Sequence, residues 1–368
     1  MLMKLRHFFN ARFCSLLGLF LLLVQVSGLE TLAGDPETTL AFLKGYDLAF
    51  LKGYDLLLKR DGEGYITDIH VREQAPTDEL LGELQTLPRL QSLVLAGTAT
   101  TDESLGLITK LEYLRNLDLR NCPVSNAGLA HLTGMKSLAA IRLSGSTGET
   151  TVDDDGMVSL AAISSLQTVM LDGLWVSEGG LEHLVVLEGL KELTLAQTLV
   201  GDEALPVIAR MKKLRRLRLA KTSITAEGLG SIAPLSELRD LDISECASLD
   251  DTALEPVGLL SQLERLNLWR VPVGDEGIRH LAGLRNMKWL NLDNTMLTDS
   301  GLGVVAGMPA LATLHIGSTA VSNAGIKHLM KLSSLREVFL ARTAVDAAGV
   351  AALRKALPEA AVVDTAAD

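Results

Sequence analysis

Residues 287–310 read M-K-W-L-N-L-D-N-T-M-L-T-D-S-G-L-G-V-V-A-G-M-P-A, a unit with two successive periodicities. Its first part predicts a short strand with one apolar side, because three apolar residues alternate with polar ones: Met287, Leu290 and Leu292. Its second part predicts a helix, because side-chain oxygens suited to the first helical amides precede apolar residues at helical spacing: Thr298 and Asp299, then Leu302, Val305 and Met308. The unit therefore predicts one strand followed by one helix.

This unit recurs through most of the 368 residues with a period of 24 residues, as L-x-x-L-x-L-x-x-T-x-V-[ST]-D-x-G-L-x-x-L-x-x-[LM]. A weaker copy begins at Ile66, and the first position of the other copies is Leu90, Leu114, Leu138, Leu166, Leu190, Leu214, Leu238, Leu263, Met287, Leu311 and Leu335. Such a period indicates a solenoid whose units bury their apolar sides against one another. We expect an α/β horseshoe of about 12 repeats over residues 66–357, with a parallel β-sheet on the concave face and helices on the convex face.

The T-x-V-[ST]-D-x-G-L segment of the pattern resembles the leucine-rich repeat family. The similarity is to the cysteine-containing and ribonuclease-inhibitor-like repeat types, and to the repeats of exported bacterial leucine-rich repeat proteins. One departure is the ninth position, which is mostly Thr here, whereas the general family pattern has Asn or Cys. The resemblance implies a protein used for macromolecular recognition.

Two copies depart from the period. The interval from Leu138 to Leu166 is 28 residues and that from Leu238 to Leu263 is 25 residues. The longer copy contains S-G-S-T-G-E-T-T-V-D-D-D-G, and we expect its four extra residues to form a projecting loop. The three aspartates, at positions 153–155, leave calcium as an alternative, but the run lacks the ligand alternation of a dedicated calcium loop.

The ends of the chain differ from the repeats. Three cationic residues precede an apolar run over 14–26, which predicts an export signal over residues 1–28 and leaves an uncleaved anchor as the alternative. Residues 29–65, in which L-A-F-L-K-G-Y-D occurs twice, are expected to form a helical cap, and residues 358–368 a closing strand and tail. We therefore expect a periplasmic, cell-surface or extracellular protein with no stable membrane span after signal removal.

The charge of the chain narrows the possible partners, and the positions of its cysteines disfavour a disulfide. The chain has 45 acidic and 34 basic residues and a net charge of -11, which disfavours nucleic acid as a partner. Cys122 and Cys246 occupy the ninth repeat position, five strands apart, beyond disulfide reach. We expect both to be buried free thiols.

The sequence contains no recognisable catalytic or cofactor motif. No H-E-x-x-H, G-x-S-x-G, phosphate-binding glycine loop or C-x-x-C pair occurs. Four histidines share one repeat position on the helical side, which favours a repeat consensus over a metal site: His131, His183, His280 and His328. We expect no enzyme activity, cofactor or bound metal.

The third, fifth and seventh repeat positions point away from the core and line the concave wall. In the C-terminal half these positions bring tryptophan, arginine and amide side chains together, a composition typical of interaction surfaces. The candidate partner-binding residues are Arg216, Arg218, Asp240, Asp242, Arg265, Asn267, Trp269, Trp289, Asn291, Asp293, His315 and Phe339. As an alternative, the charges only neutralise one another and Arg265 stacks on Trp289.

These residues lead to the hypothesis of a non-catalytic recognition protein whose preformed concave sheet binds a protein or a glycan. Because the sheet is rigid before binding, little ordering entropy opposes association. The alternative hypothesis is a structural spacer of the cell envelope, or a scaffold that self-associates through its ends.

Overall fold

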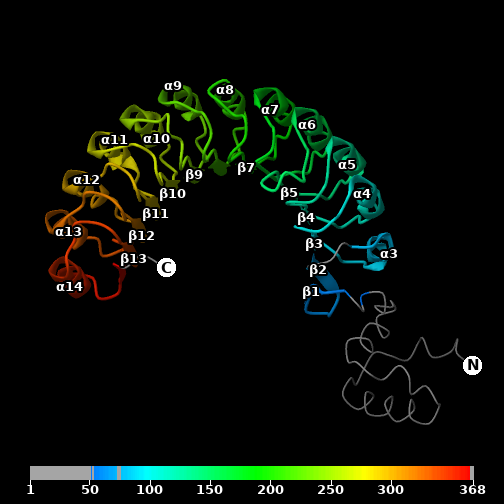
Figure 1. Ribbon diagram of the computed structural model, residues 1–368, viewed down its shortest axis with the longest axis horizontal. Helices are drawn as coiled ribbons and strands as arrows, with labels where there is room; N and C mark the ends of the chain where they lie inside the picture. Colours follow the sequence, from blue (N-terminus) through cyan, green and yellow to red (C-terminus); the bar gives the residue numbers. More distant parts are fainter. Residues whose placement is uncertain (1–50, 52–53, 73–75, 365–368) are drawn as a thin grey trace, which may run out of the picture.

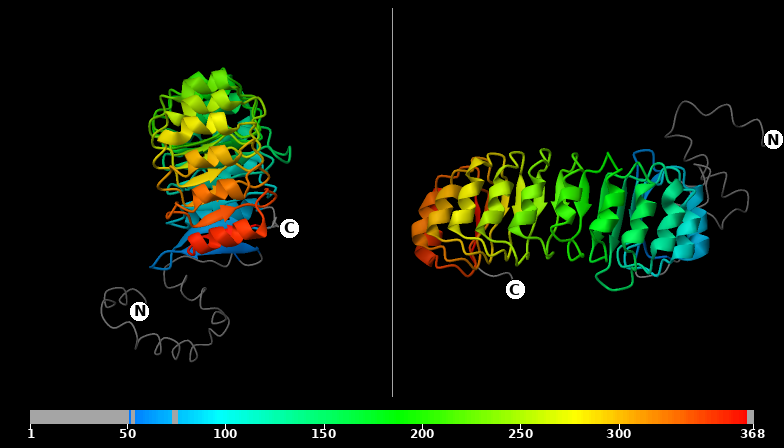
Figure 2. Two further views of the ribbon diagram at one scale, coloured as in Figure 1. Left: turned by 90° about the vertical axis from the view of Figure 1, so that its left-hand side faces the viewer. Right: turned by 90° about the horizontal axis from the view of Figure 1, so that it is seen from above.

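The computed structural model describes residues 51, 54–72 and 76–364. They form one curved solenoid in which the strands line the inner wall and the helices form the outer wall (Figure 1). Perpendicular views show the coils stacked side by side along the arc (Figure 2). The expected α/β leucine-rich repeat horseshoe is confirmed.

A single sheet of 14 strands follows the order of the chain. The strands are β1 Leu56–Arg60, β2 Ile66–Val71, β3 Ser92–Val94, β4 Asn116–Asp118, β5 Ala140–Ser144, β6 Thr168–Asp172, β7 Glu192–Thr194, β8 Arg216–Arg218, β9 Asp240–Asp242, β10 Arg265–Asn267, β11 Trp289–Asn291, β12 Thr313–His315, β13 Glu337–Phe339 and β14 Ala361–Val363. All neighbours pair in parallel except β1 with β2. The register aligns equivalent positions, so Leu266 lies between Leu241 and Leu290.

Each coil returns along the convex face through a short helix. The α-helices are α3 Asp78–Glu83, α4 Asp102–Ile108, α5 Asn126–His131, α6 Asp154–Ala161, α7 Glu178–Leu184, α8 Ala204–Ile208, α9 Ala226–Leu229, α10 Leu254–Gly258, α11 Asp275–Arg279, α12 Asp299–Val305, α13 Asn323–Leu329 and α14 Ala347–Ala356. The 3-10 segments are η3 Leu84–Thr86, η4 Leu132–Gly134, η5 Gly230–Ile232, η6 Asp251–Ala253 and η7 His280–Gly283. The repeat leucines between the two walls form one continuous buried core.

The D-x-G part of the repeat links consecutive coils. Asp275 accepts hydrogen bonds from the amide and the hydroxyl of Thr298 in the next coil, at 2.9 and 2.5 Å. Thr298 in turn accepts the amide of Ser300 and caps α12. A Cβ atom at Gly301 would lie 2.5 Å from Asp275 Oδ1, so the carboxylate fits only beside glycine. The repeat aspartate therefore joins coils, whereas we expected it to start its own helix.

The equivalent aspartate of the next coil, Asp299, binds Ser322 in the same way. Burial disfavours its ionisation, but the hydrogen bonds from Ser322 outweigh burial and lower the pKa of Asp299. The ionised carboxylate is therefore the form that holds the two coils together.

The ninth repeat position closes the turn at the end of each strand. Thr295 donates its hydroxyl proton to the carbonyl of Leu292 at 2.7 Å. The thiols at this position instead reach the preceding coil, Cys122 to the carbonyl of Leu95 at 3.0 Å and Cys246 to that of Leu219 at 3.2 Å. Both cysteines are buried and free, as expected, and burial raises the pKa of each thiol.

The N-terminal end differs in part from the expectation. Residues 56–60, expected within a helical cap, form the strand β1. Alternate leucines, Leu56 and Leu58, pack against the core, and antiparallel pairing satisfies backbone groups along β2. Residues 1–50, with the expected export signal and most of the duplicated segment, lie outside the described residues. At the other end, residues 361–363 form a parallel strand beside β13.

Candidate binding surface

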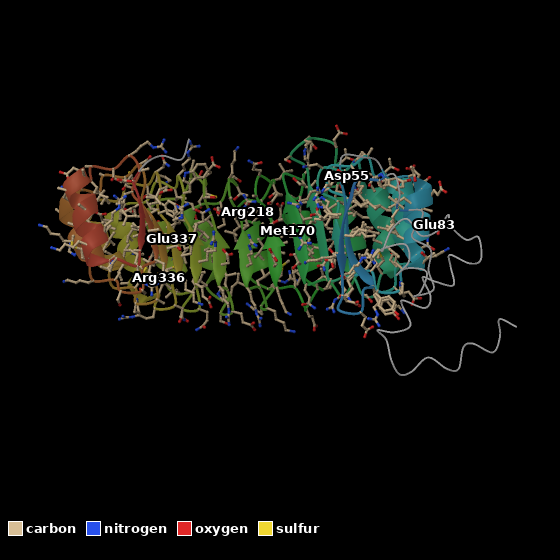
Figure 3. All side chains as sticks on the ribbon, turned by 90° about the horizontal axis from the view of Figure 1, so that it is seen from below. Asp55, Glu83, Met170, Arg218, Arg336 and Glu337 are labelled. Carbon is tan, nitrogen blue, oxygen red and sulfur yellow. The ribbon has the colours of Figure 1, made fainter. Side chains whose placement is uncertain are left out.

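The strands present alternate side chains to the concave wall. In β11, Leu290 is fully buried while Trp289 and Asn291 are half-buried on the inner face. Figure 3 shows this wall, with Met170, Arg218 and Glu337 on successive parts of the sheet. All twelve candidate residues lie on this wall or directly after its strands, as the repeat positions predict.

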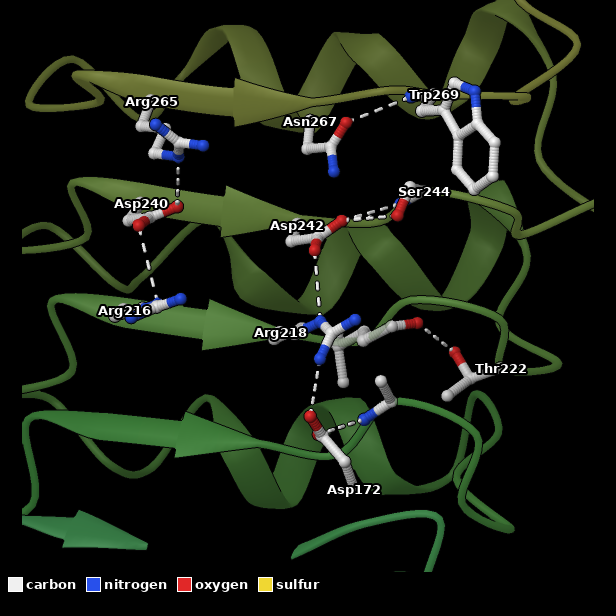
Figure 4. A network of polar contacts seen from close by, with 12 residues as sticks. Asp172, Arg216, Arg218, Thr222, Asp240, Asp242, Ser244, Arg265, Asn267 and Trp269 are labelled. Carbon is white, nitrogen blue, oxygen red and sulfur yellow. Dashed lines mark hydrogen bonds and ion pairs between the residues drawn. The ribbon is translucent and has the colours of Figure 1, made fainter. Parts of the chain in front are cut away.

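One half of the wall carries paired charges. Arg218 lies between two carboxylates, 2.5 Å from Asp172 and 3.1 Å from Asp242 (Figure 4). Asp172 is itself held by the amide of Ala196 at 2.8 Å. Ser244 donates its amide and its hydroxyl to Asp242, at 3.1 and 2.6 Å.

A second row of charges runs parallel to the first. Arg216 lies 3.0 Å from Glu192 and 3.5 Å from Asp240, and Arg265 approaches Asp240 at 3.9 Å. Burial raises the pKa of Asp240, although the positive charges of Arg216 and Arg265 oppose this shift. We call the two rows the charge network: Asp172, Glu192, Arg216, Arg218, Asp240 and Asp242.

Beyond the charge network the wall becomes aromatic. The guanidinium of Arg265 lies 3.5 Å from the ring centroid of Trp289. The Trp289 and His315 rings are 5.2 Å apart at 52°, and His315 stacks on Phe339 at 4.1 Å and 9°. We call these four residues the aromatic ladder; it spans β10 to β13. Stacking of Arg265 on Trp289, given above as an alternative, is present.

Two polar side chains hold the centre of the aromatic ladder. Asp293 accepts a short hydrogen bond from the amide of Gly317 and lies 3.6 Å from His315 Nδ1. Asn291 accepts the amide of Asp293 at 2.9 Å. The imidazole thus lies near the Asp293 carboxylate and is stacked on the Phe339 ring.

Trp269 is separate from the ladder, although its strand is adjacent to that of Trp289. The centroid of its ring lies 4.6 Å from the guanidinium of Arg270, and the Arg270 backbone is left-handed, with a φ of 56°. The backbone amide of Trp269 donates a hydrogen bond to Asn267 Oδ1 at 3.2 Å. The two tryptophans therefore make different contacts, and of the two only Trp289 belongs to the aromatic ladder.

Sequence reasoning missed two parts of the wall. Asp172 and Glu192 lie outside the chosen half and complete the charge network. On β4, the buried carboxylate of Asp118 binds Arg120 through two nitrogens, at 2.7 and 2.9 Å. The signal was available, since Glu192, Asp118 and Asp172 occupy third, fifth and seventh repeat positions, which face the concave wall, but it was overlooked among smaller neighbours.

Two shallow depressions lie away from the concave face. One, of about 390 Å³, is lined by Gln91, Tyr113, Arg115, Lys136, Ser137, Ala139, Ser165 and Gln167. The other, of about 480 Å³, lies among the convex helices between Ala226 and Leu259. Within residues 51, 54–72 and 76–364, no group of three or more His, Cys, Asp and Glu side chains is arranged to hold a metal ion. No described helix has the length and apolar character needed to span a bilayer.

Comparisons with known proteins establish the fold. No family model and no curated protein matches the sequence. Among solved structures, an internalin from Listeria monocytogenes is similar at 23% identity and a TM-score of 0.56, covering 82% of this chain and 87% of that one. A leucine-rich repeat protein from Leptospira interrogans is similar at 15% identity and a TM-score of 0.51, covering 89% and 97%. The chain is thus similar to leucine-rich repeat solenoids along most of its length.

Proposed function

We propose that this leucine-rich repeat protein is a non-catalytic recognition protein that binds a partner protein through the aromatic ladder of its concave face. The observation that carries the proposal is the unbroken row of ring contacts that joins Arg265, Trp289, His315 and Phe339. Large aromatic and arginine side chains held rigidly on a sheet are the composition of binding hot spots. Their rigidity lowers the entropy cost of association.

In this proposal the charge network contributes less to the binding free energy than the aromatic ladder does. Arg216 and Arg218 each already contact two carboxylates. A partner that buried these arginines and carboxylates would remove charged groups from water, and new contacts would have to offset that desolvation cost. In this proposal the network sets the approach and orientation of the partner, while the aromatic ladder supplies most of the binding free energy.

The stacking favours a protein over a glycan. A sugar ring binds best on an open aromatic face, but Arg265 covers one face of Trp289, and His315 and Phe339 cover one face of each other. Ring edges carry partial positive charge and fit aromatic faces and carbonyl or carboxylate oxygens. Such groups are plentiful in protein segments.

Affinity capture with residues 29–368 tests the proposal. Immobilised protein is exposed to envelope extract and culture fluid, and retained partners are quantified by mass spectrometry. Trp289→Ala and Phe339→Ala should each weaken capture of the main partner at least about 10-fold. Met170→Ala is the matched control, because Met170 is a half-buried apolar residue on the same wall at the fifth repeat position. Equal capture by all variants, or capture of glycan alone, would contradict the proposal.

Export belongs to the same proposal and rests on the sequence of residues 1–28. Mass spectrometry of the mature N-terminus should find cleavage near Gly28. An intact Met1 on protein retained inside the cell would contradict export. The alternative function, an envelope spacer or self-associating scaffold, predicts concentration-dependent oligomers in sedimentation that do not respond to Trp289→Ala.

A further inference from the structure

The 28-residue repeat changes one rim of the solenoid. Its strand β5 and the following strand β6 have five residues each, whereas β3, β4 and β7 have three. Gly145 and Gly173 approach so closely that a Cβ at Gly145 would overlap the Gly173 carbonyl. The loop between β5 and α6 protrudes from the rim formed by the strand-to-helix turns (Figure 2). This coil therefore departs from its neighbours on the rim rather than on the concave wall.

Two large apolar side chains stand exposed beside this loop. Trp175 is 76% exposed and Leu199, at the same position of the next coil, is 61% exposed. A backbone bridge joins Trp175 to Asp153, and the amide of Leu199 donates to the carbonyl of Val176 at 3.1 Å. These contacts fix the backbone and leave the side chains outside. Trp175 is more exposed than either tryptophan of the concave wall.

The surroundings of this pair carry mainly negative charge, although the exposed Lys221 lies in the coil that follows Leu199. Between Arg142 and Arg210 the sequence contains one cationic Lys or Arg, Lys191, whose ammonium binds Gln167 at the start of the strands. The coils of Trp175 and Leu199 and the coil before them carry exposed carboxylates for which the described residues show no ion pair: Glu149, Asp155, Glu178 and Glu203. The concave charge network is paired, whereas this rim is not.

A calcium site at residues 153–155, the alternative to a projecting loop, does not explain the acidic side chains of this rim. The carboxylate of Asp153 accepts the side-chain amide of Asn126 at 2.6 Å, and that of Asp154 accepts the hydroxyl of Ser177 at 2.5 Å. Both aspartates therefore join neighbouring coils, like the repeat aspartates elsewhere. Asp155 is the one carboxylate of the run that faces solvent without such a contact.

We propose that the Trp175 rim, defined as Trp175, Leu199 and the four flanking carboxylates, is a second docking surface for a cationic segment of a partner protein. Apolar side chains of the segment cover Leu199, and its Lys or Arg side chains lie on the open Trp175 ring beside the carboxylates. Charge complementarity selects this occupant, because an acidic segment or an anionic lipid surface is repelled. The rim lies outside the aromatic ladder, so the proposal is independent of the concave function.

Fluorescence anisotropy with the protein spanning residues 29–368 tests the proposal. The probe is a fluorescein-labelled 12-residue peptide of alternating lysine and leucine. Trp175→Ala should weaken its binding at least about 10-fold, as expected for a hot-spot aromatic. Asp155→Asn combined with Glu178→Gln should weaken binding and reduce its salt dependence. A peptide of alternating glutamate and leucine should bind at least 10-fold more weakly.

Matched controls use equivalent positions on another coil. Met296 occupies the same turn position as Trp175 and is 58% exposed, so Met296→Ala should leave binding within twofold. Glu276→Gln is the charge control, because Glu276 has the repeat position of Asp155 but is paired with Arg279. Trp289→Ala should also leave binding unchanged. Equal weakening by Met296→Ala, loss of binding on Trp289→Ala, or self-association that depends on Trp175 would each overturn the proposal.

Discussion

Apart from Asp172 at a seventh position, the charge network and the aromatic ladder occupy the same third and fifth repeat positions on adjoining strands, but their side chains contact one another differently. Arg218 contacts two carboxylates, and Asp240 lies between Arg216 and Arg265. Beyond Asp240 the side chains meet through rings: Arg265 stacks on Trp289, the Trp289 and His315 rings meet at a tilt, and His315 stacks on Phe339. One wall therefore contains a partly exposed region of paired charges and a region of rigid, partly apolar surface.

The difference follows from what each region loses on contact with a partner. Half-exposed ion pairs contribute little to stability and are costly to desolvate. Stacked rings lose little hydration and little side-chain entropy, so they can bury against a partner with net gain. Equivalent scaffold positions can thus serve orientation in one region and affinity in the other.

The largest expected effect tests whether both regions stand on the same core. Leu217 beneath the charge network and Leu290 beneath the aromatic ladder are both fully buried. Leu217→Ala and Leu290→Ala should each cost about 2 to 5 kcal/mol of unfolding free energy in urea titrations. A much larger cost for Leu290→Ala would show that the ladder belongs to the core and not to the surface.

A smaller effect is expected from loosening the ladder. Asp293→Ala removes the acceptor for the Gly317 amide and the contact with His315, which should cost about 1 to 3 kcal/mol. Asp293→Asn keeps a side-chain oxygen and should recover part of the loss. Nuclear magnetic resonance of the His315 ring should show altered shifts in the Ala variant. Unchanged ring shifts would mean that Phe339 alone positions the imidazole.

The charge network should respond less. Arg218→Ala removes both of its ion pairs, and because the side chain is exposed to solvent the expected change is within about 1 kcal/mol. The salt dependence of the unfolding midpoint should also decrease in the Arg218→Ala variant. Arg216→Ala makes the equivalent change in the second row of the charge network and should give a similar result. A loss above about 3 kcal/mol would place Arg218 among the structural residues.

The smallest effect concerns pH, and its sign differs between two aspartates. Burial raises the pKa of Asp240, so its charge costs stability above that pKa, and acidification through it removes the cost. Despite burial, hydrogen bonds from Ser322 lower the pKa of Asp299, so its stabilisation is complete above the ordinary value of 3.8 and is lost as the pH falls through the lowered value. Carboxyl carbon titrations should place the two midpoints on opposite sides of 3.8. Coincident midpoints would contradict both assignments.

Much of the fold follows from local pattern. The spacing of Leu290 and Leu292 predicts a strand, and the repeat predicts the parallel register and the inward-facing ninth position of Cys122 and Cys246. The N-terminal cap was harder to predict from the sequence, because residues 56–60 pair with β2 through backbone groups, and these carry no residue-specific signal. The use of the repeat aspartate was also misassigned, since Asp275 and its partner Thr298 belong to different coils.

The candidate surface was predictable as a set of positions, but not as a set of contacts. Arg218 reaches across β7 to Asp172, 46 residues earlier, because Thr194 on the intervening strand is small. Trp269 and Trp289 occupy adjacent strands yet belong to different contacts. The exposed Trp175 was passed over, because sequence reasoning looked only at concave positions.

The 24-residue period is sufficient to specify the solenoid, its curvature and the face each residue takes, because these follow from local periodicity and contacts between neighbouring coils. The order of the stacked rings, the pairing of each arginine and the exposure of Trp175 emerge only when the coils are assembled. They depend on side-chain rotamers and on the size of residues one or two coils away, which no local pattern encodes.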